Sequence, residues 1–371
     1  MDDLGRVTDA LGPAKIVHVY EPAAALRAVV AIDNLACGPA IGGIRMAPDV
    51  TTEEAVRLAR AMTLKNAAAG LAHGGGKAVI AADPRMPIVD KERAVRAFAC
   101  AIRDLTEYIP GPDMGTDERC MAWIHDEIGR AVGLPAELGG IPLDAIGATG
   151  WGLVACADAA REFTDVTLAG ARVVVQGFGA VGMHVARFLA ERGAVLVAVA
   201  DSRGTIIDAA GLDVAALVAL KQAGKSVVDH DRGTQREPDA VLDVACDLWI
   251  PAARPDVVRA DNVARLRTRL VLEGANIPIT ADAEEVLHRR GVTVVPDFIA
   301  NAGGVICAAI EYHGGTEKAA LQVIAEKIAA NTRAVLAEST RTGIRPRAAA
   351  MALAERRVRA AGAYRRWNRP A

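Results

Sequence analysis

Residues 177–182 read Gly-Phe-Gly-Ala-Val-Gly, and this short run constrains the fold more than any other part of the chain. It follows the apolar segment Val173–Val175 and leads into Val181–Leu189, where apolar residues recur at the spacing of a helix. A strand that turns through glycines directly into a helix is half of a β-α-β unit, which builds a parallel sheet with helices packed on it. The sequence therefore predicts an α/β fold around this point.

The glycines of this run have distinct predicted roles in holding a dinucleotide. Gly177 allows the sharp turn, Gly179 lets the backbone approach a diphosphate, and Gly182 lets the helix pack closely on the strand. The free N–H groups and the positive end of the helix dipole then form an anion site. A tight turn without a ligand is the alternative for an isolated run of this kind. The candidate cofactor-binding residues here are Gly177, Phe178, Gly179, Ala180, Val181 and Gly182.

A carboxylate at the expected spacing strengthens the prediction of a dinucleotide site. The segment Ala194–Ala200 is typical of the next strand and ends at Asp201, about 20 residues after the glycine run. A carboxylate at this place accepts hydrogen bonds from ribose hydroxyls and repels a 2′-phosphate, which favours NAD. Ser202 and Arg203 follow at once and either could contact such a phosphate, so NADP is not excluded.

The remaining chain alternates strand-like and helix-like segments, and its 371 residues exceed the size at which one core usually stops growing. We expect two domains. Residues 1–146, joined by returning C-terminal helices of about 335–371, form a mostly parallel α/β domain, and residues 147–334 form a doubly wound Rossmann-type domain. Helices are expected over 52–69, behind a capping box at 51–54, over 151–162 and over most of 316–361. Strands are expected over 15–20, 26–32, 40–46, 78–82, 171–176, 194–200, 247–250, 269–273 and 292–296.

The composition limits the functions that the chain can have. Hydrophobic residues make up 52% and charged residues 24%, and a net charge of -2 gives no electrostatic reason for nucleic acid or an anionic membrane as a partner. The six cysteines are scattered, which predicts buried apolar side chains in a reducing compartment rather than disulfides or metal ligands. The N-terminal residues show no secretory signal, and no apolar run reaches the roughly 20 residues of a membrane span. We expect a cytoplasmic protein without a structural metal.

Lys77 is conspicuous because lysine is rare in this chain, with eight lysines among the 43 basic residues, and because three glycines precede it. A solvated surface lysine is the alternative, but glycines before it would cost conformational entropy without gain. They make sense if the backbone passes close to a ligand. Burial at the head of an apolar strand, with Lys65 as a second cation nearby, would lower the pKa of Lys77 and let it act as a base.

Asp113 is the candidate partner of this lysine. It lies in Pro110-Gly111-Pro112-Asp113, where two prolines and a glycine restrict the backbone. An ordinary turn or a helix cap is the alternative role for an aspartate in such a segment. Asp117 lies close by in the sequence, and spacing alone does not exclude it as the partner.

Several motifs, in order along the chain, resemble those of the glutamate/leucine/phenylalanine/valine dehydrogenases. The resemblance covers about residues 15–358. Its most specific parts are Gly38–Met46, Met62–Leu71, Gly74–Lys77, Pro112–Met114, Ala148–Gly152, the glycine run, Glu273–Asn276 and Asn301–Val305. It implies an enzyme that oxidatively deaminates an L-amino acid to the keto acid and ammonia. It also implies a homo-oligomer built through the first domain, which would hold the substrate.

The resemblance also implies roles for single residues. Lys65 would pair with the substrate α-carboxylate with help from Asn301, and Gly42 and Gly43 would let backbone approach the substrate. Lys77 would activate the water that attacks an iminium ion, and Asp113 would carry protons to and from the nitrogen. Contacts to the cofactor are implied for Thr149 and Asn276 at the nicotinamide end, and for Ala252 in the loop that follows residues 247–250.

Two positions suggest the kind of substrate. In family members that act on glutamate, the positions matching Ile41 and Ala308, close to Val305, carry a lysine and a serine for the side-chain carboxylate. Here both are apolar, so a dicarboxylic substrate would leave a buried charge unpaired. This favours an apolar L-amino acid such as leucine, valine, isoleucine or phenylalanine, although two core positions would carry the same residue types.

Other features leave alternatives open. The segments 201–204 and 273–278 look more like the glutamate branch of the family, so a glutamate dehydrogenase is one alternative. A catalytically silent dinucleotide-binding regulator is another, against which the intact lysines and Asp113 argue. An enzyme for hydroxy acids would need a histidine in a recognisable motif, and His73 has a structural role in our interpretation. Arg254-Pro255 departs from the family, where an uncharged Leu-Gly usually stands, and introduces a charge and a rigid residue that we expect near the nicotinamide half of the cofactor site.

Overall fold

The computed structural model describes residues 8–365, which form two compact units. Unit 1 contains the chain up to Pro142, Val305–Ala320, and the residues from Leu353 onward, and unit 2 contains Leu143–Gly304 and Leu321–Ala352. The sequence-based division at 146/147 and at about 335 differs from this grouping chiefly in where the C-terminal segments go. Residues 1–7 and 366–371, at the ends of the predicted first domain, lie outside the described residues.

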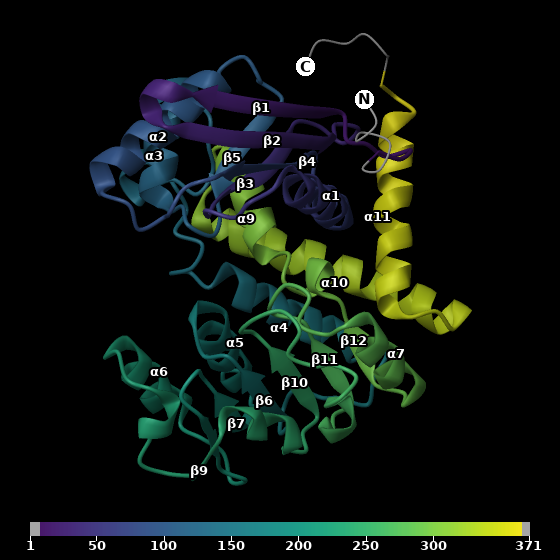
Figure 1. The fold of residues 1–371 in the computed structure, drawn as a ribbon. Helices are drawn as coiled ribbons and strands as arrows, with labels where there is room; N and C mark the ends of the chain where they lie inside the picture. The colour runs from purple at the N-terminus through teal and green to yellow at the C-terminus, as the bar shows by residue number, and fades with distance from the viewer. Residues whose placement is uncertain (1–7, 366–371) are drawn as a thin grey trace. The chain divides into compact units, whose positions relative to one another are not determined.

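Unit 1 is built on a mixed sheet with the order β1-β2-β4-β3-β5 (Figure 1). Its strands are β1 (Lys15–Glu21), β2 (Leu26–Asn34), β3 (Ala40–Met46), β4 (Gly74–Ile80) and β5 (Tyr108–Pro112). The pairs β3–β4 and β3–β5 are parallel, but β1–β2 and β2–β4 are antiparallel. The expected mostly parallel sheet is therefore half antiparallel. The short connection at Pro22–Ala24 explains the β1–β2 pair, since a link of a few residues joins antiparallel strands only.

Helices cover both faces of this sheet. Helix α1 (Thr52–Ala68) begins at the predicted cap, where the Thr51 hydroxyl accepts from the Glu54 N–H at 3.1 Å, and packs on β2 and β4. Helices α2 (Ile88–Ala101) and α3 (Glu118–Ile128) form the main core of the unit on the opposite face, with Phe98 and Met121 fully buried. Helix α9 (Gly303–Tyr312) lies mostly in unit 1.

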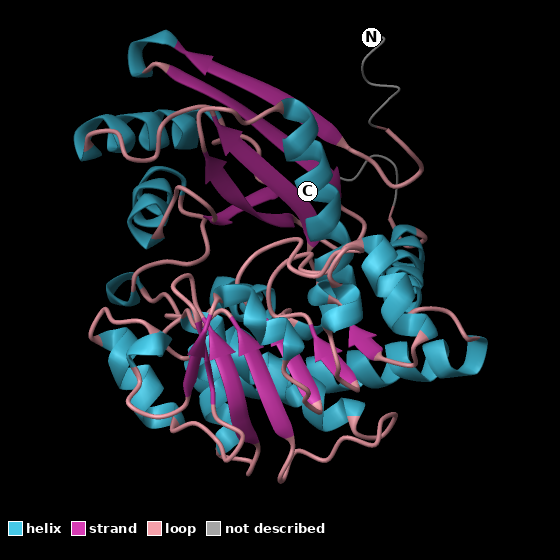
Figure 2. Cartoon of the chain, turned by 60° about the horizontal axis from the view of Figure 1, so that its bottom comes forward, coloured by secondary structure: helices cyan, strands magenta, loops and turns pink. Residues whose placement is uncertain are grey.

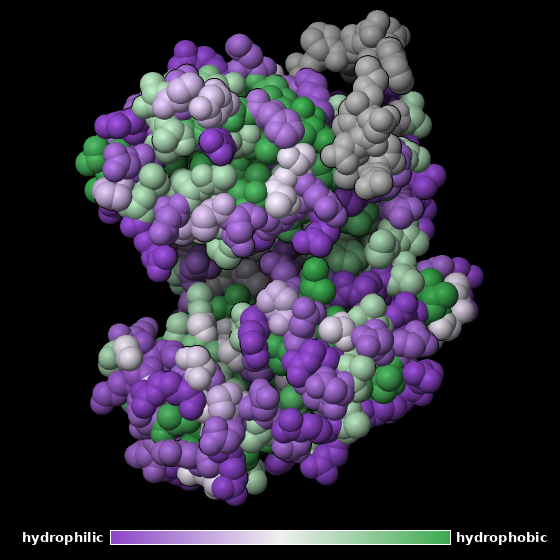
Figure 3. Space-filling model, viewed as in Figure 1, coloured by the Kyte–Doolittle hydropathy of each residue, from purple (hydrophilic) through white to green (hydrophobic). Residues whose placement is uncertain are grey.

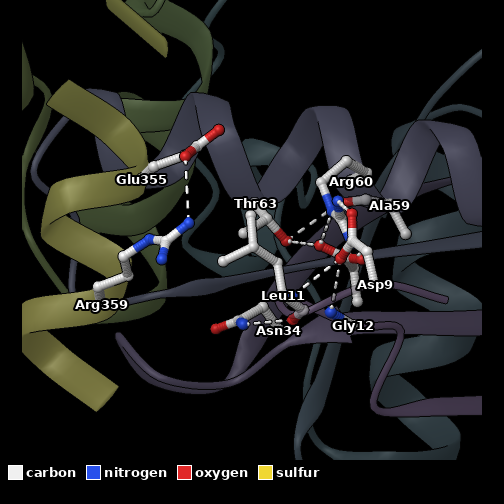
Figure 4. A network of polar contacts seen from close by, with 10 residues as sticks. Asp9, Leu11, Gly12, Asn34, Ala59, Arg60, Thr63, Glu355 and Arg359 are labelled. Carbon is white, nitrogen blue, oxygen red and sulfur yellow. Dashed lines mark hydrogen bonds and ion pairs between the residues drawn. The ribbon is translucent and has the colours of Figure 1, made fainter. Parts of the chain in front are cut away.

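A polar network holds α1 to the sheet (Figure 4). The Arg60 guanidinium donates to both carboxylate oxygens of Asp33 at 3.0 and 2.9 Å and to Asp9 at 2.6 and 2.8 Å. Thr63, one turn further along α1, donates to the same Asp33, which is fully buried, at 2.6 Å. Because a buried carboxylate needs such partners, the network fixes the helix that carries Lys65.

Unit 2 has a sheet of the order β12-β11-β10-β6-β7-β8-β9, and Figure 2 shows its strands side by side with helices packed against them. The strands are β6 (Arg172–Gln176), β7 (Val195–Ala200), β8 (Thr205–Ile207), β9 (Thr234–Arg236), β10 (Leu248–Pro251), β11 (Leu270–Leu272) and β12 (Thr293–Val295). The strands from β12 to β7 pair in parallel, and β8 and β9 add antiparallel pairs at one edge. The strand order reverses between β6 and β10, which confirms the predicted Rossmann-type topology.

The helices of unit 2 follow the predicted alternation. They are α4 (Ala148–Ala160), α5 (Ala180–Ala190), α6 (Val214–Gln222), α7 (Ala281–Arg289) and the short α8 (Asp297–Ala300). Two long C-terminal helices, α10 (Glu317–Thr342) and α11 (Pro346–Gly362), confirm that the stretch from about 316 to 361 is helical. The strands β5, β8 and β9 were not predicted from the sequence.

The cysteines only partly match the expectation of burial. Cys120, Cys156, Cys246 and Cys307 are buried, but Cys100 is exposed near the end of α2, and each described cysteine is free. Among the described residues, no group of three or more potential ligands could hold a metal ion. A search of the same residues finds no helix long and apolar enough to cross a membrane.

Candidate functional site

The three glycines before Lys77 lie inside β4 and not in a turn ahead of it. A Cβ at Gly74 would lie 1.8 Å from the Asn34 carbonyl oxygen, and one at Gly75 would lie 2.0 Å from the backbone nitrogen of Thr63 in α1. At Gly76 a Cβ would lie 2.8 Å from the ring of Tyr108, which is still too close for a side chain. The glycines therefore serve the close approach of the protein's own backbone and packing. The expectation that they make room for a ligand was wrong for these positions.

Strand register brings Lys77 and Asp113 together. Gly43 of β3 lies in register between Lys77 on β4 and Gly111 on β5, on the face of the sheet that α1 covers. With no side chain on Gly43, the lysine can reach across β3 to the segment after β5. A Cβ on Gly43 would lie 2.8 Å from the Asp113 Cβ and 3.3 Å from the Lys77 Nζ, so glycine is required here.

The resulting cluster contains two cations and two carboxylates. The Lys77 Nζ lies 2.7 Å from Asp113 Oδ2, and the Arg45 Nε donates to the same oxygen at 3.0 Å. The Arg45 Nη1 donates to Glu54 of α1 at 2.6 Å. The Lys77 side chain is only 7% exposed, whereas that of Asp113 is 26% exposed. The aspartate is thus the open end of the pair, and the lysine is its enclosed end.

The surroundings shift the pKa values of this pair. Burial lowers the pKa of Lys77, opposed by Asp113, and the charge of Arg45 lowers it further. The neighbouring cation that acts on Lys77 is therefore Arg45, where the sequence pointed to Lys65. Burial by itself raises the pKa of Asp113, but Lys77 and Arg45 outweigh it and hold that pKa below its usual range. A lysine that loses its proton easily beside a carboxylate that keeps its charge is suited to proton transfer.

Asp113 is held in a turn, whereas Asp117, the alternative partner of Lys77, has another role. The Asp113 N–H donates to the Thr116 hydroxyl at 3.0 Å, and the Thr116 hydroxyl donates to the Ile44 carbonyl of β3 at 2.7 Å. Asp117 is the N-cap of α3, where its carboxylate accepts from the Cys120 N–H at 3.0 Å. The structure thus gives Asp117 the capping role and places Asp113 alone beside Lys77.

The residues expected to contact the substrate lie on three elements of unit 1, except Asn301, which lies in unit 2 directly after α8 and is buried. Ile41 is in β3 and is 4% exposed. Lys65 is half-buried in the last turn of α1, and the next residue, Asn66, donates to a carbonyl oxygen of β4 at 2.7 Å. Val305 and Ala308 are half-buried on α9. No charged side chain replaces the lysine and serine that the resemblance associates with glutamate.

Buried polar contacts position α9 within unit 1. The Glu311 carboxylate accepts from the backbone N–H groups of Gly133, Leu134 and Ile141 at 2.7 to 3.1 Å. At the end of the helix, His313 Nε2 lies 3.1 Å from His73 Nε2. The Nδ1 of the buried His73 lies 3.1 Å from the Pro39 carbonyl, so this histidine bridges structural elements.

Unit 2 contains a cavity of about 830 Å³ at the carboxyl ends of β6, β7 and β10. This is the place where strand order reverses and where such sheets bind ligands. Gly177 has a φ of +95°, and its Cβ would lie 2.6 Å from Ala253, so only glycine fits the turn. A Cβ on Gly182 would lie 2.0 Å from the Gly177 carbonyl oxygen. A Cβ on Gly179 would meet no atom within 4 Å, which leaves space for a diphosphate beside the start of α5.

Asp201 lines this cavity, but its carboxylate is already engaged. One oxygen accepts from the Arg203 N–H at 2.9 Å and the Ser226 hydroxyl at 2.8 Å, and the other from Lys221 Nζ at 2.9 Å and the Val227 N–H at 3.0 Å. Although burial opposes it, these bonds lower its pKa to about 2. With its side chain 8% exposed, Asp201 is not the free ribose acceptor that the sequence suggested. Lys221 also offsets the charge expected to repel a 2′-phosphate.

Other predicted cofactor contacts lie around this unit. Ser202 and Ala252 line the cavity, and Phe178 is 1% exposed beneath the glycine turn. Thr149 lies in the first turn of α4. Asn276 is exposed in the loop after β11, and its side-chain oxygen accepts from Asn301 Nδ2 at 3.1 Å.

Arg254 lies in the same cavity, beside the glycine turn. It follows Ala253, which contacts Gly177, and its side chain is exposed. Among the described residues it has no hydrogen bond or ion pair. The sequence placed this departure from the family near the nicotinamide half of the cofactor, whereas the structure places it next to the glycines that would hold a diphosphate.

Sequence reasoning missed the roles of Arg45, Glu54 and Lys221. Arg45 alternates with Gly43 along β3, so a strand of period two puts both on one face, and this signal was available. Glu54 and Lys221 lie on helices, and only the packing of those helices brings them to their partners.

The chain matches two family models, one described as glutamate/leucine/phenylalanine/valine dehydrogenase over residues 139–366 and one as the dimerisation domain of Glu/Leu/Phe/Val dehydrogenases over residues 16–130. An NADP-specific glutamate dehydrogenase of Saccharolobus shibatae is 38% identical over 293 residues, which are 75% of this chain and 69% of the relative.

Solved structures with similar folds include a hetero-hexameric glutamate dehydrogenase of Thermus thermophilus in its Leu-bound form. It is 31% identical with a TM-score of 0.81, and the match covers 94% of this chain and 89% of that one. An L-tryptophan dehydrogenase of Nostoc punctiforme is 25% identical with a TM-score of 0.77, over 97% of this chain and 98% of that one.

Proposed function

The chain belongs to the glutamate/leucine/phenylalanine/valine dehydrogenase family of amino acid dehydrogenases, and we propose that it oxidatively deaminates an apolar L-amino acid with NAD(P). The observation that carries the proposal is the enclosed Lys77 with its Nζ 2.7 Å from Asp113, beside a glycine that keeps the space open. Such a pair fits a reaction that needs a base for water and a proton carrier for an amine.

In the proposed mechanism, each of three side chains of unit 1 has one task. Lys65 pairs with the α-carboxylate of the substrate. The bound cofactor, when present, supplies the acceptor for the hydride that leaves Cα. Lys77 in its neutral form takes a proton from the water that attacks the resulting iminium carbon. Asp113, the more open of the pair, exchanges protons with the nitrogen that leaves as ammonia.

The polarity around Ile41 supports an apolar substrate. Ile41 and Ala308 offer no charge, and Arg45 is already paired with both Asp113 and Glu54. A distal carboxylate placed among these residues would be buried without a partner, which costs several kcal/mol. The similarity to a tryptophan dehydrogenase is in keeping with a substrate of this class.

Glutamate is the second candidate substrate, because a relative at 38% identity is a glutamate dehydrogenase. A panel of twenty L-amino acids with NAD and with NADP distinguishes the two and tests the whole proposal. We expect reduction of the cofactor with leucine, valine, isoleucine or phenylalanine. Turnover restricted to glutamate would support the alternative, and no turnover at all would support a dinucleotide-binding protein without catalysis.

The nucleotide cavity fits a dinucleotide, with an open diphosphate position at Gly179 and the start of α5 beside it. We propose NAD as the cofactor without excluding NADP. The ion pair between Asp201 and Lys221 weakens the charge that would reject a 2′-phosphate, and the relative in Saccharolobus shibatae is NADP-specific. Thr149 and Asn276 would contact the nicotinamide end of the cofactor.

We also propose that the chain forms a homo-oligomer through the edge strand β1. Its Tyr20 is 66% exposed, and a groove lined by His18, Val19 and Val50 runs beside it. Figure 3 shows hydrophobic surface on unit 1 around β1 and β2. β1 is at the edge of its sheet, and the unpaired backbone groups of an edge strand are a ready surface for another copy.

Light scattering after size-exclusion chromatography tests this assembly. We expect the wild-type mass to be at least twice the 38.7 kDa of a single chain. Tyr20→Asp should shift it toward the single chain, because a charge at the edge opposes apolar contact. The matched control Tyr364→Asp, at a tyrosine 88% exposed beyond the end of α11, should leave it unchanged. A monomeric wild type would contradict the proposal.

A further inference from the structure

Arg347, in the first turn of α11, is the centre of a charged cluster in unit 2. Its guanidinium donates to Glu273 at 2.6 Å, to Glu284 at 2.7 Å and to Asp297 at 3.0 Å. The side chains of Glu273 and Glu284 are 0% and 1% exposed, and that of Asp297 is 10% exposed. One guanidinium group thus donates hydrogen bonds to three carboxylates that are buried in the fold.

Two of these carboxylates also hold the loop after β11. The Asp297 N–H donates to Glu273 at 2.8 Å, and the second oxygen of Asp297 accepts from the Ile277 N–H at 3.0 Å. Among the described residues, the third carboxylate, that of Glu284 of α7, forms its hydrogen bond with Arg347 and none with this loop. The cluster therefore has two members that touch the loop and one that does not.

The loop needs this support because its backbone is strained. Ile277 has a φ of +48°, in the left-handed region that β-branched residues avoid. Its side chain is 57% exposed, so burial does not compensate for the strain. Instead, its N–H is held by Asp297 and its carbonyl accepts from the Asp256 N–H at 3.1 Å. Strain of this kind persists only when surrounding contacts fix the backbone.

The residue before Ile277 is Asn276, the predicted nicotinamide contact. Its side chain is oriented by Asn301, whose amide donates to the Asn276 side chain at 3.1 Å and to the carbonyls of Gly274 and Ala275 at 3.3 Å each. Asn301 is in turn tied to the cluster, since its N–H donates to the Asp297 carbonyl at 2.8 Å. Asp297 therefore holds Asn276 in two ways, through the backbone of Ile277 and through the side chain of Asn301.

We propose that Arg347, acting through Glu273 and Asp297, is a positioning residue that holds Asn276 ready to bind the nicotinamide end of the cofactor. Nothing in the sequence pointed to it, because it lies 71 residues after Asn276, in the first turn of α11, and only tertiary packing brings it to this loop. The proposal rests on the proposed function, which assigns Asn276 to the cofactor. It requires that loss of the contacts between Arg347, Glu273 and Asp297 weaken the binding of the nicotinamide and leave the binding of the adenosine and the diphosphate unchanged.

The test compares dissociation constants for NADH and for ADP-ribose, which lacks the nicotinamide, by fluorescence or calorimetric titration. For Arg347→Met and Asp297→Ala we expect NADH to bind about tenfold more weakly, the effect of losing a well-made polar contact. ADP-ribose should bind within about twofold of wild type. Arg347→Lys should recover little, because a point charge cannot replace the planar fork.

Glu284→Gln is the matched control. It removes one carboxylate from Arg347 without touching the loop, so NADH should bind as to the wild type, and thermal unfolding reports any general damage. Should Arg347→Met fail to fold, Asp297→Ala and Asn276→Ala decide the matter, since the double variant should lose no more NADH affinity than Asn276→Ala alone.

Equal weakening of NADH and ADP-ribose, or additive effects in the double variant, would overturn the positioning role. Wild-type binding separates this failure from the failure of the proposed function. If the unaltered protein binds neither ligand, the proposed function fails. If it binds both ligands and the variants Arg347→Met and Asp297→Ala weaken both equally, the proposed function stands and only the positioning role of Arg347 is refuted.

Discussion

Lys77, Asp113 and Arg45 meet at a single carboxylate oxygen, and this geometry decides the proposed proton chemistry. Asp113 Oδ2 accepts from both cations, at 2.7 and 3.0 Å, and these contacts keep the aspartate charged. Burial and the charge of Arg45 lower the pKa of Lys77 although Asp113 opposes them, which favours the neutral form of the lysine. The lysine is the enclosed member of the pair, which suits a base whose water must be held in one place.

Replacing the lysine tests its role directly. Lys77→Ala should lower kcat by 10²-fold or more, a typical contribution of a general base, and should leave the NADH dissociation constant unchanged. Lys225→Ala is the control, since that lysine is exposed in unit 2. Loss of NADH binding in Lys77→Ala would show that this lysine belongs to the cofactor site.

The charges around the pair predict opposite shifts in pH dependence. Arg45 lowers the pKa values of both Lys77 and Asp113, so Arg45→Gln should raise them and move the acidic limb of the kcat/KM profile up by roughly one pH unit. Glu54 raises the pKa of Lys77, so Glu54→Gln should move the same limb down. A profile that stays in place in both variants would exclude Lys77 as the titrating base.

The sequence predicted the lysine and the aspartate but not the arginine between them. Local pattern identifies unusual residues, such as a lysine after glycines, whereas the partner depends on the register of β3, β4 and β5. Asp201 shows the same limit. Its place at the end of β7 was predicted, but its partners Lys221 and Ser226 lie 20 and 25 residues further on, and they come back only through tertiary packing.

In the strands and turns of this chain, glycines have two structural roles. In β4 they let α1, β2 and Tyr108 approach the strand, and at Gly179 the missing side chain leaves open space beside the start of α5. The sequence indicates that close approach is needed at both places but not what approaches. For this reason the expectation of a ligand was wrong for the glycines before Lys77, whereas the role of the nucleotide turn in holding a diphosphate stays a prediction that the open space at Gly179 supports.

Two alanine substitutions distinguish a glycine that is needed for packing from a glycine that leaves open space. Gly75→Ala would place a Cβ 2.0 Å from the backbone of α1, so the melting temperature should fall, with an unfolding cost of about 1–3 kcal/mol or more. Gly179→Ala meets no protein atom and should leave the melting temperature unchanged while weakening NADH binding. The reverse pattern, a stability loss at Gly179 and none at Gly75, would contradict both assignments.

For the whole molecule, the alternation of strands and helices predicted two α/β units, and the structure and the family confirm this. The path of the C-terminal region was harder to predict. Helix α10 lies mostly in unit 2, while α11 passes from unit 2 to unit 1 after Ala352. The helical pattern continues through Ala352 without a break, so it gives no signal of this change of unit.

The central claim is that this amino acid dehydrogenase acts on apolar substrates, and reductive amination tests it most directly. The measurement is kcat/KM with ammonia and NADH for 4-methyl-2-oxopentanoate, the keto acid of leucine, against 2-oxoglutarate. An unpaired distal carboxylate costing several kcal/mol predicts a ratio of at least about 10² in favour of the apolar keto acid. A ratio that favours 2-oxoglutarate would contradict the account and make the chain a glutamate dehydrogenase.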